Sequence, residues 1–412
     1  MNSTKSHYKV DLSRILQDLN EVNSFTTSYK DNPRGITRRS FTNEDSKARL
    51  WLIKKLEDLN LDVNVDGFGN VTATTKNSGK KVVVGSHLDT IPNGGQYDGI
   101  LGILSALEAL RVIKENNIEL NKRIELVAFT DEEERFYSFL GSYAYTGDLD
   151  DVNLDKIKDS DGKRLKDQME KQGFDLKTAV KNSGTNLKEI DSFVELHIEQ
   201  GPLLENKKVD IGVVDKVKGD WRYALTVKGK TDHAGFPMQF REDAYLELND
   251  ILYKAYQKSK EFLDEGLLFT VGKIELSTNL ANVAPGKAKG TIDLRVDDIT
   301  ILEKMDLFIK QLAKESSLEV EVDYILKLDP TNFDEKVCKA IEDSCTKLNL
   351  SSMRISSGAG HDAQVLATKV PSAMIFVPSV EGRSHCPEEL TLDSDIEKGS
   401  LLLLETLLSL AQ

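Results

Sequence analysis

Short apolar runs alternate with helical patterns along much of this chain, and the first of these runs ends at a cluster of polar side chains. The apolar run 82–84 is followed by Gly85, Ser86 and His87. The strand-like runs are 82–84, 124–129, 193–198 and 373–377, and the helical patterns include 11–24, 44–60 and about 100–114. Strands that alternate with helices favour a layered α/β domain whose active groups lie at strand ends.

A different order of elements begins near Gly212 and ends near Asp329. The predicted elements there are a strand at 221–227, a helix at 242–263, strands at 268–275 and 288–296, a helix at 301–313 and a strand at 318–324. This β-α-β-β-α-β order is the ferredoxin-like pattern of a small separate domain. We therefore predict a discontinuous larger domain, 1–212 and 329–412, with an inserted domain at 213–328. Residues 146–190, rich in Asp and Lys, predict a solvent-facing helical insertion.

The composition of the 412 residues excludes several classes of protein. Hydrophobic residues make up 39% and charged residues 30%, which is typical of a soluble globular protein. The net charge is −14 and no basic stretch is present, which argues against a nucleic-acid partner. No run approaches the length of a membrane span, and the N-terminus lacks an apolar signal region. The three cysteines form no disulfide framework. We expect a cytoplasmic protein.

Five of the six histidines fall in short runs that also carry a carboxylate or a glycine turn; only His7 stands apart. The runs are Gly85-Ser86-His87-Leu88-Asp89, Glu195-Leu196-His197-Ile198-Glu199, Asp232-His233-Ala234-Gly235, Gly358-Ala359-Gly360-His361-Asp362 and Ser384-His385-Cys386-Pro387. An imidazole that binds a divalent metal needs an acceptor for its second ring nitrogen, and a nearby carboxylate supplies one. The pattern predicts a metallohydrolase.

The candidate ligands lie at predicted strand ends or in glycine turns. They are His87, Asp98 in the turn before the helix at about 100–114, one glutamate of Asp131-Glu132-Glu133-Glu134, His197 and His385. Asp89 is placed to orient the His87 ring. Any one of these residues alone is more often a packed histidine or a solvated acid. Together they follow the order that one crevice requires, and the donor set suits Zn²⁺ or Mn²⁺.

These residues resemble the peptidase family M20 metallohydrolases, and within them the hydantoinase/carbamoylase branch of N-carbamoyl-L-amino acid hydrolases, allantoate amidohydrolases and β-ureidopropionases. The resemblance covers nearly the whole chain. Its motifs are 85–90, 93–99, 195–202, 357–363 and 375–379, of which 195–202 is the most diagnostic. The resemblance implies a Zn-peptidase-like layered catalytic domain with an inserted lid and dimerisation domain, and a homodimer.

The same resemblance implies a site with two divalent cations, Zn or Mn, with Co or Ni as further possibilities. His87, Asp98 and His197 would hold one ion, and Asp98, Glu133 and His385 the other. Glu132 would be the general base. The family usually has a glycine and another residue between the acidic pair and Arg-Phe, whereas Glu134 alone separates Glu133 from Arg135 here. The base and ligand are therefore either Glu132 and Glu133 or Glu133 and Glu134. We favour the first pair, because it continues the strand register directly.

Substrate recognition is predicted from an Arg and an Asn in the inserted domain. Arg295 and Asp293 are two residues apart on a predicted strand and so share a face. A surface ion pair is the commoner outcome, but an Arg fork with an Asn amide can also clamp a carboxylate. The resemblance implies the clamp: Asn282 and Arg295 hold the substrate carboxylate, with Gln200 and the Gly360 backbone nearby. It also implies that His233 stabilises the oxyanion, although the loop after His233 is one residue short.

The first hypothesis is hydrolysis of N-carbamoyl-L-amino acids to the L-amino acid, ammonia and carbon dioxide. Its nearest rivals are an allantoate amidohydrolase, a β-ureidopropionase and an N-acyl-L-amino acid amidase. A hypothesis of another class is a non-catalytic amino acid or peptide binding protein, against which the Glu132-Glu133 pair argues. An aminopeptidase ranks third, because it needs a carboxylate for the free α-amino group where this chain has the Arg-Asn clamp.

Overall fold

A computed structural model describes residues 8–27, 34–76, 78–149 and 153–412; His7 lies outside these ranges. The chain divides into two compact units. The larger unit comprises Met1–Asp215, Phe333–Ile355 and His361–Gln412, and the smaller one Lys216–Asn332 and Ser356–Gly360. The sequence assigns 356–360 to the larger domain. Its contacts place it in the smaller unit, because Nη1 of Arg295 donates to the Gly358 carbonyl at 2.9 Å.

A mixed sheet forms the centre of the larger unit. Its strands are β1 (Asp62–Val65), β2 (Val71–Thr74), β3 (Lys81–His87), β4 (Arg123–Phe129), β5 (Ile190–Ile198), β6 (Ile211–Val217), β15 (Ser352–Ser357) and β16 (Ser372–Val377). The order is β1-β2-β4-β3-β5-β16-β6-β14, where β14 is Thr331–Asn332, and β15 also pairs with β6. β3 pairs in parallel with β4 and β5, and β5 in parallel with β16. The carboxyl ends of these four strands therefore meet at one edge, where ligands bind in sheets of this kind.

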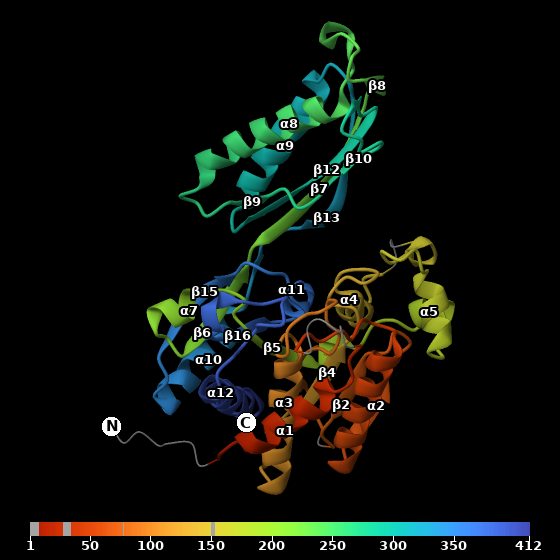
Figure 1. Cartoon of the computed structure of the whole chain (residues 1–412). Coiled ribbons are helices and arrows are strands. Elements are labelled where there is room, and N and C mark those ends of the chain that lie inside the picture. Colours follow the sequence, from red (N-terminus) through yellow and green to blue (C-terminus); the bar gives the residue numbers. More distant parts are fainter. Residues whose placement is uncertain (1–7, 28–33, 77, 150–152) are drawn as a thin grey trace. The chain divides into compact units, whose positions relative to one another are not determined.

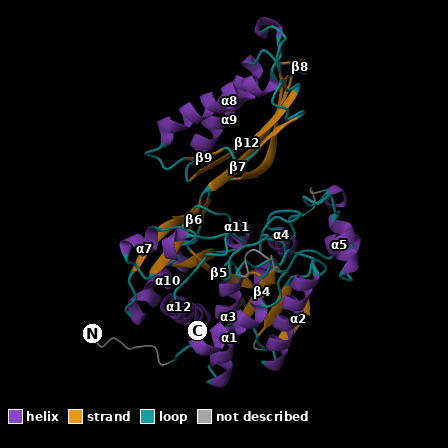
Figure 2. Cartoon of the chain, in the orientation of Figure 1, coloured by secondary structure: helices purple, strands orange, loops and turns teal. Residues whose placement is uncertain are grey.

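Helices cover this sheet in two groups (Figures 1 and 2). The helices of the unit are α1 (Leu12–Asn23), α2 (Asn43–Asp58), α3 (Ile100–Glu115), α4 (Leu140–Thr146), α5 (Leu165–Lys171), α6 (Leu176–Lys181), α7 (Leu203–Lys207), α10 (Glu335–Leu348), α11 (Asp362–Ala367) and α12 (Asp393–Ala411). α3 contacts α1, α12 and strands β3 to β5, and α12 also contacts α10. α4 and α11 contact each other and the same strands. The sheet and the two groups of helices make the predicted layered α/β domain, and the fold class is confirmed.

The four parallel strands are buried along most of their length because both of their faces are covered. Every residue of β3 and β16 is buried. α3 is also buried on nearly all sides. Burial on both faces explains why these strands read as continuous apolar runs in the sequence rather than as alternating ones.

Residues 153–190 contain short helices and many exposed residues, as predicted, but the segment does not face solvent throughout. Their short helices α5 and α6 bury Leu165, Met169 and Leu176 against Phe41 and other aromatic side chains of the larger unit. In addition, Arg135 forms a buried ion pair with Asp159 at 3.0 Å. The surface of the segment is polar, as its composition indicates, but its apolar residues join a satellite core.

The smaller unit is an antiparallel sheet packed against two helices. Its elements are β7 (Gly219–Lys228), β8 (Asp232–His233), α8 (Ala244–Ser259), β9 (Leu268–Thr270), β10 (Ile274–Leu276), β11 (Val283–Ala284), β12 (Lys287–Val296), α9 (Ile299–Glu315), β13 (Glu319–Leu328) and β14 (Thr331–Asn332). The order is β10-β12-β7-β13, with β9 also paired with β12. α8 and α9 lie side by side over this sheet (Figure 1). The predicted strand 268–275 is therefore two strands, β9 and β10.

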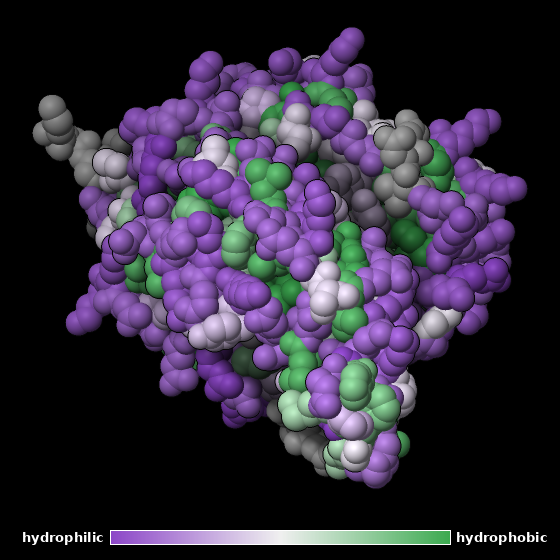
Figure 3. Space-filling view, turned by 90° about the horizontal axis from the view of Figure 1, so that it is seen from above, coloured by the Kyte–Doolittle hydropathy of each residue, from purple (hydrophilic) through white to green (hydrophobic). Residues whose placement is uncertain are grey.

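The core of this unit follows the alternation of its strands. Trp221, Tyr223, Leu225 and Val227 of β7 are buried in the cluster that includes α8 and α9. The alternate positions hold Arg222, Ala224, Thr226 and Lys228 and are more polar, as expected for a sheet with one packed face. Across the molecule, most of the face shown in Figure 3 is hydrophilic, with apolar patches between the polar residues. No helix in the described part of the chain is long and apolar enough to span a membrane.

Candidate metal centre

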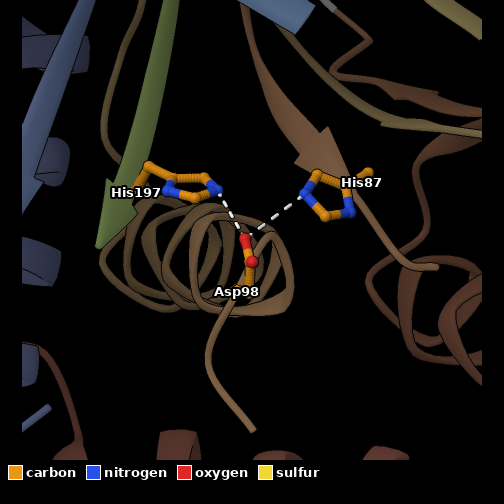
Figure 4. Close-up of side chains that lie close together, drawn as sticks. All are labelled: His87, Asp98 and His197. Atoms are coloured by element: carbon orange, nitrogen blue, oxygen red, sulfur yellow. Dashed lines mark ion pairs between the residues drawn. The ribbon is translucent and has the colours of Figure 1, made fainter. Parts of the chain in front are cut away.

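Two histidines at strand ends face one carboxylate. His87 is the last residue of β3, His197 is the next-to-last residue of β5, and Asp98 lies just before α3. Oδ1 of Asp98 is 2.9 Å from Nε2 of His197 and 3.6 Å from Nε2 of His87. Figure 4 shows the two rings reaching toward Asp98 from the ends of their strands. The parallel pairing of β3 with β5 sets this spacing.

Backbone carbonyls hold the other nitrogen of each ring. Nδ1 of His87 lies 3.0 Å from the carbonyl oxygen of Asp89, and Nδ1 of His197 lies 2.9 Å from that of Ile198. A proton on each Nδ1 completes these hydrogen bonds and leaves the lone pair of Nε2 pointing toward Asp98. Nε2 of His197 is buried and makes no hydrogen bond despite its closeness to Asp98. A buried ring nitrogen without a hydrogen bond is suited to binding a metal ion.

Gly99 gives Asp98 its place beside His87. Its φ is +67°, a backbone conformation that side chains other than glycine rarely adopt. A Cβ at Gly99 would also lie 2.4 Å from the His87 ring. The chain therefore passes closer to the imidazole than any other residue type permits.

His385 contacts the second oxygen of Asp98 and also lies beside Glu133. Nε2 of His385 lies 3.1 Å from Oδ2 of Asp98 and 3.4 Å from Oε1 of Glu133. His385 is half exposed and has a φ of +56°. Among the described residues, two of the four groups of possible metal ligands contain Asp98: His87 with Asp98 and His197, and Asp98 with Glu133 and His385. Asp98 belongs to both and turns one oxygen to each.

Asp89 acts on the acidic turn more directly than on the His87 ring. Its carboxylate accepts from the backbone N–H groups of Glu132 (3.4 Å) and Glu133 (3.2 Å), but lies 4.0 Å from Nδ1 of His87. The ring contact is made by the Asp89 carbonyl instead. Asp131, with a φ of +62°, accepts from three further N–H groups of the same turn. Two buried carboxylates thus shape the turn that presents Glu132 and Glu133.

The positions of the three glutamates in this turn distinguish between the two candidate pairs of base and ligand. Oε2 of Glu132 is 3.7 Å from Nε2 of His87, and Glu133 faces His385. Glu134 has a φ of +54° and belongs to none of the possible metal groups among the described residues. It occupies the position of the family's glycine in a conformation that suits glycine. This geometry supports the pair Glu132 and Glu133.

The ionisation of the cluster reflects crowded carboxylates and imidazoles. Burial alone lowers the pKa of His87, but Glu132, Asp98 and Asp89 raise it well above its ordinary value. Burial alone raises the pKa of Asp98, but the neighbouring imidazoles hold it well below its usual range. Burial and the Asp98 charge raise the pKa of Glu133 to about 8. Divalent cations bound among these groups would favour the ionised carboxylates and the neutral imidazoles. The donor set, imidazoles with shared carboxylates, fits such ions.

Gln200 contacts the cluster itself. Its Nε2 donates to Oδ2 of Asp98 at 3.0 Å and to Oγ of Ser384 at 3.2 Å, while its Oε1 is buried without a hydrogen-bond partner. The sequence predicted a substrate contact for Gln200. In this structure its amide nitrogen supports Asp98.

The other predicted substrate residues belong to the smaller unit, at two places. The backbone N–H of Ala234 donates to the Asn282 carbonyl, so Asn282 lies beside His233, and both residues are exposed. Arg295 pairs with Asp220 at the other end of β12, eight residues beyond Lys287. At about 3.3 Å per residue, the two ends of β12 are roughly 26 Å apart. Asn282 and Arg295 therefore do not form one clamp within a single smaller unit.

Arg295 makes the ion pair that its spacing from Asp293 suggests. Nε and Nη2 donate to the two Asp293 oxygens, each at 3.0 Å, and Asp220 lies 3.3 Å from Nη2. Its remaining contact is with the Gly358 carbonyl, which brings the segment containing Gly360 toward Arg295.

Sequence reasoning missed two buried acids that support the cluster. Glu195 accepts from Oγ of Ser86 at 2.7 Å and from the N–H of Ala363 at 3.0 Å. Glu389 accepts from the N–H groups of Tyr97 and Asp98. Glu195 stands in the motif 195–202, which was a usable signal. Glu389 has no periodic or motif signal of its own.

The model of the peptidase family M20/M25/M40 matches residues 83–409. This chain belongs to that family. It is 32% identical over 98% of both chains to an N-carbamoyl-L-amino-acid amidohydrolase of Paenarthrobacter aurescens. It is 34% identical to an allantoate amidohydrolase of Bacillus subtilis, over 92% of this chain and 93% of that one. An amidase of the hydantoinase/carbamoylase family from Burkholderia vietnamiensis has a similar structure, with a TM-score of 0.87 and 32% identity over 100% and 99% of the two chains.

These likenesses confirm the resemblance inferred from the motifs. The M20 protein described here is an amidohydrolase, a hydrolase that acts on non-peptide C–N bonds. A non-catalytic binding protein is thereby set aside. The family is metal-dependent, and the side chains of this M20 chain include groups that can bind metal.

We expect Gly99→Ala to lose metal, because its Cβ would displace the His87 ring. Gly162→Ala is the matched control: its φ is +78°, but nothing lies within 4 Å of a Cβ there. Both variants place an alanine at a positive φ, so both carry backbone strain. Elemental analysis after dialysis measures the ions retained per chain. Equal metal content in the two variants would contradict the placement of Asp98 against His87.

Proposed function

We propose that this protein is a two-metal amidohydrolase that cleaves the ureido C–N bond of N-carbamoyl-L-amino acids. The products are the L-amino acid, ammonia and carbon dioxide. The observation that carries the proposal is the position of Asp98, with one oxygen toward His87 and His197 and the other toward His385. A carboxylate so placed is suited to two cations, each with its own imidazoles.

Each proposed ion has three protein ligands. His87, Asp98 and His197 hold the first ion, and Asp98, Glu133 and His385 the second. Zn²⁺ and Mn²⁺ suit these donors best, and Co²⁺ or Ni²⁺ are compatible with them. When bound, the ions polarise the scissile carbonyl and make water acidic enough to attack at neutral pH.

Glu132 is the proposed general base. It is buried beside His87, and the Asp89 carboxylate holds its backbone N–H. Glu132 takes a proton from the attacking water, and the same carboxyl group then returns that proton to the leaving nitrogen as the C–N bond breaks. Glu133 alone would supply the carboxylate for the second ion. The second acid next to it, Glu132, therefore supports separate roles for the two glutamates.

His233 is the proposed donor to the oxyanion. Its Nδ1 accepts from the N–H of Gly235 at 3.1 Å. In the neutral ring this places the proton on Nε2, which leaves Nε2–H free to donate to a developing negative charge. The shortened loop keeps this geometry, since the N–H of Phe236 donates to the His233 carbonyl.

The proposed substrate contacts are Arg295, Asn282, Gln200 and the Gly360 backbone. Arg295 is the charged group for a substrate carboxylate, because a guanidinium binds a carboxylate bidentately. Its fork is engaged with Asp293, so the substrate would have to compete with this ion pair. Asn282 acts with His233, its neighbour, rather than with Arg295.

The second candidate substrate is allantoate, which likewise combines a carboxylate with ureido groups. The 34% identity to the Bacillus subtilis allantoate amidohydrolase supports it. β-Ureidopropionase and N-acyl-L-amino acid amidase activities have no feature of this chain in their favour beyond the family itself.

Ammonia release from a substrate panel tests the proposal. The panel contains N-carbamoyl-L-amino acids with several side chains, their D-enantiomers, allantoate and N-carbamoyl-β-alanine, each with Zn²⁺, Mn²⁺, Co²⁺ or Ni²⁺; N-acetyl-L-amino acids are followed by release of the free amino acid. We expect the highest kcat/KM with an N-carbamoyl-L-amino acid and no turnover after chelation. Faster turnover of allantoate would transfer the assignment to the second candidate, and full activity without metal would contradict both.

Three Glu→Gln variants assign the acidic turn. We expect Glu132→Gln to keep both ions and to lose about 10²–10⁴-fold in kcat, as loss of a general base does. Glu133→Gln should release one ion, and Glu134→Gln should retain both ions and most of the activity. Metal content and kcat are measured for each variant. A Glu134→Gln variant that loses kcat while Glu132→Gln keeps it would instead select Glu133 and Glu134.

We also propose a homodimer through the smaller unit. Tyr253 and Tyr256 of α8, Leu268 of β9 and Ile274 of β10 are exposed apolar side chains. β10 lies at one edge of the sheet of the smaller unit. An edge strand beside apolar side chains is a common site of pairing between copies. Leu268→Glu should shift the sedimentation coefficient from a dimer to a monomer. Leu50→Glu, at an exposed leucine of α2, is the control. A monomer at all concentrations in the unmodified protein would exclude the dimer.

A further inference from the structure

A buried carboxylate connects two segments of the proposed metal centre that are far apart in the chain. Glu389 is 3% exposed. Its Oε1 accepts from the N–H groups of Tyr97 (2.8 Å) and Asp98 (3.1 Å), and its Oε2 accepts from Oγ of Ser384 at 2.8 Å. Ser384 directly precedes His385. One side chain thus holds the backbone at Asp98 and the residue before His385.

The same network returns to the Asp98 carboxylate. Ser384 has a single hydroxyl proton, and its shorter contact is with Glu389, so its oxygen is left to accept from Nε2 of Gln200 at 3.2 Å. Nε2 of Gln200 also donates to Oδ2 of Asp98 at 3.0 Å. The hydrogen bonds form a ring through Glu389, Ser384, Gln200 and Asp98. Both the backbone and the carboxylate of Asp98 belong to this ring.

Two local features show how closely this arrangement is built. A Cβ at Gly95 would lie 1.9 Å from the carboxyl carbon of Glu389, so the turn before Asp98 has room for that carboxylate only because residue 95 is glycine. His385 has a φ of +56°, which is uncommon for a residue other than glycine. Such a conformation persists where surrounding contacts determine it, and the contact of Ser384 with Glu389 is one of them.

Glu389 also brings a second carboxylate toward Asp98, which costs electrostatic energy. Three hydrogen bonds to its oxygens offset that cost. A residue that merely filled space here would be better replaced by an apolar side chain of similar size, because an apolar group needs no such compensation. The presence of an acid here therefore indicates that its hydrogen bonds to Tyr97, Asp98 and Ser384 are what the position requires.

We propose that Glu389 is a positioning residue that sets the distance between Asp98 and His385, and so determines the affinity for the ion held by Asp98, Glu133 and His385. It touches neither substrate nor metal. This inference rests on the proposed two-metal site and adds to it a residue that controls one of its two ions. Hydrogen bonds that hold metal ligands in place commonly change affinity tenfold to a hundredfold.

Glu389→Ala and Glu389→Gln test this role, with Glu388→Ala as the matched control. Glu388 is the preceding glutamate and is exposed, with an ion pair to Arg383 at 3.3 Å. Equilibrium dialysis with Zn²⁺ measures both dissociation constants for the full-length protein. The visible spectrum of the Co²⁺ form reports ligand geometry, and the melting temperature of the metal-free form reports folding.

We expect Glu389→Ala to weaken the more loosely bound ion by about 10- to 100-fold and to change the Co²⁺ spectrum. Glu389→Gln should stay close to the unmodified protein, because its amide oxygen still accepts from Tyr97 and Asp98 and its NH₂ can donate to Ser384. Glu388→Ala should leave both dissociation constants and the spectrum unchanged.

Three results would overturn the inference. The first is unchanged affinity for both ions in Glu389→Ala, with or without a lower melting temperature. The second is an equal loss in Glu389→Gln and Glu389→Ala, which would indicate charge rather than hydrogen bonds. If Glu389→Ala does not fold, Ser384→Ala replaces it, and unchanged affinity there is the third. An unmodified protein that binds fewer than two ions is a separate result, which would remove the two-metal proposal itself.

Discussion

The arrangement of the site in the larger unit depends on one carboxylate, that of Asp98, which contacts imidazoles on both of its sides. Asp98 lies just before a helix that is buried on nearly all sides, so it has little freedom to move. Its two oxygens face His87 and His197 on one side and His385 on the other. Parallel strands bring the first two histidines to one edge of the sheet, and a loop near the C-terminal end of the chain brings the third. An error of about 1 Å at Asp98 would therefore disturb both groups of ligands at once.

A cluster of buried charges of this kind is stable only if its parts are held by other polar groups. Carbonyls of Asp89 and Ile198 fix the rings of His87 and His197. Asp89 and Asp131 accept the backbone N–H groups of the acidic turn, and Glu389 accepts those before α3. Each acid thus satisfies donors that would otherwise be buried unpaired. Burial and the charge of Asp98 raise the pKa of Glu133 to about 8, and a cation bound beside this carboxyl group would favour its ionised form.

The sequence predicted the layered fold and the residues around Asp98 because both depend on local patterns. The apolar runs 82–84 and 373–377 lie in β3 and β16, and each histidine near Asp98 stands in a short recognisable motif. Contacts between distant segments left no such pattern: Glu389 meets Asp98 across 291 positions, and nothing in its own neighbourhood reveals this. The single strand expected at 268–275 is broken into β9 and β10, because its register against β12 shifts by one residue between Thr270 and Ile274. Asn282 and Arg295 are close in sequence, yet an extended strand separates them within one smaller unit, which the residue spacing did not indicate.

Anomalous X-ray diffraction from crystals grown with Mn²⁺ or Zn²⁺ tests the central claim most directly, because it locates ions without relying on activity. The account predicts two anomalous peaks on opposite sides of the Asp98 carboxylate, one next to Nε2 of His87 and His197 and the other next to Glu133 and His385. A single peak, or peaks that leave Asp98 bound to only one ion, would contradict it.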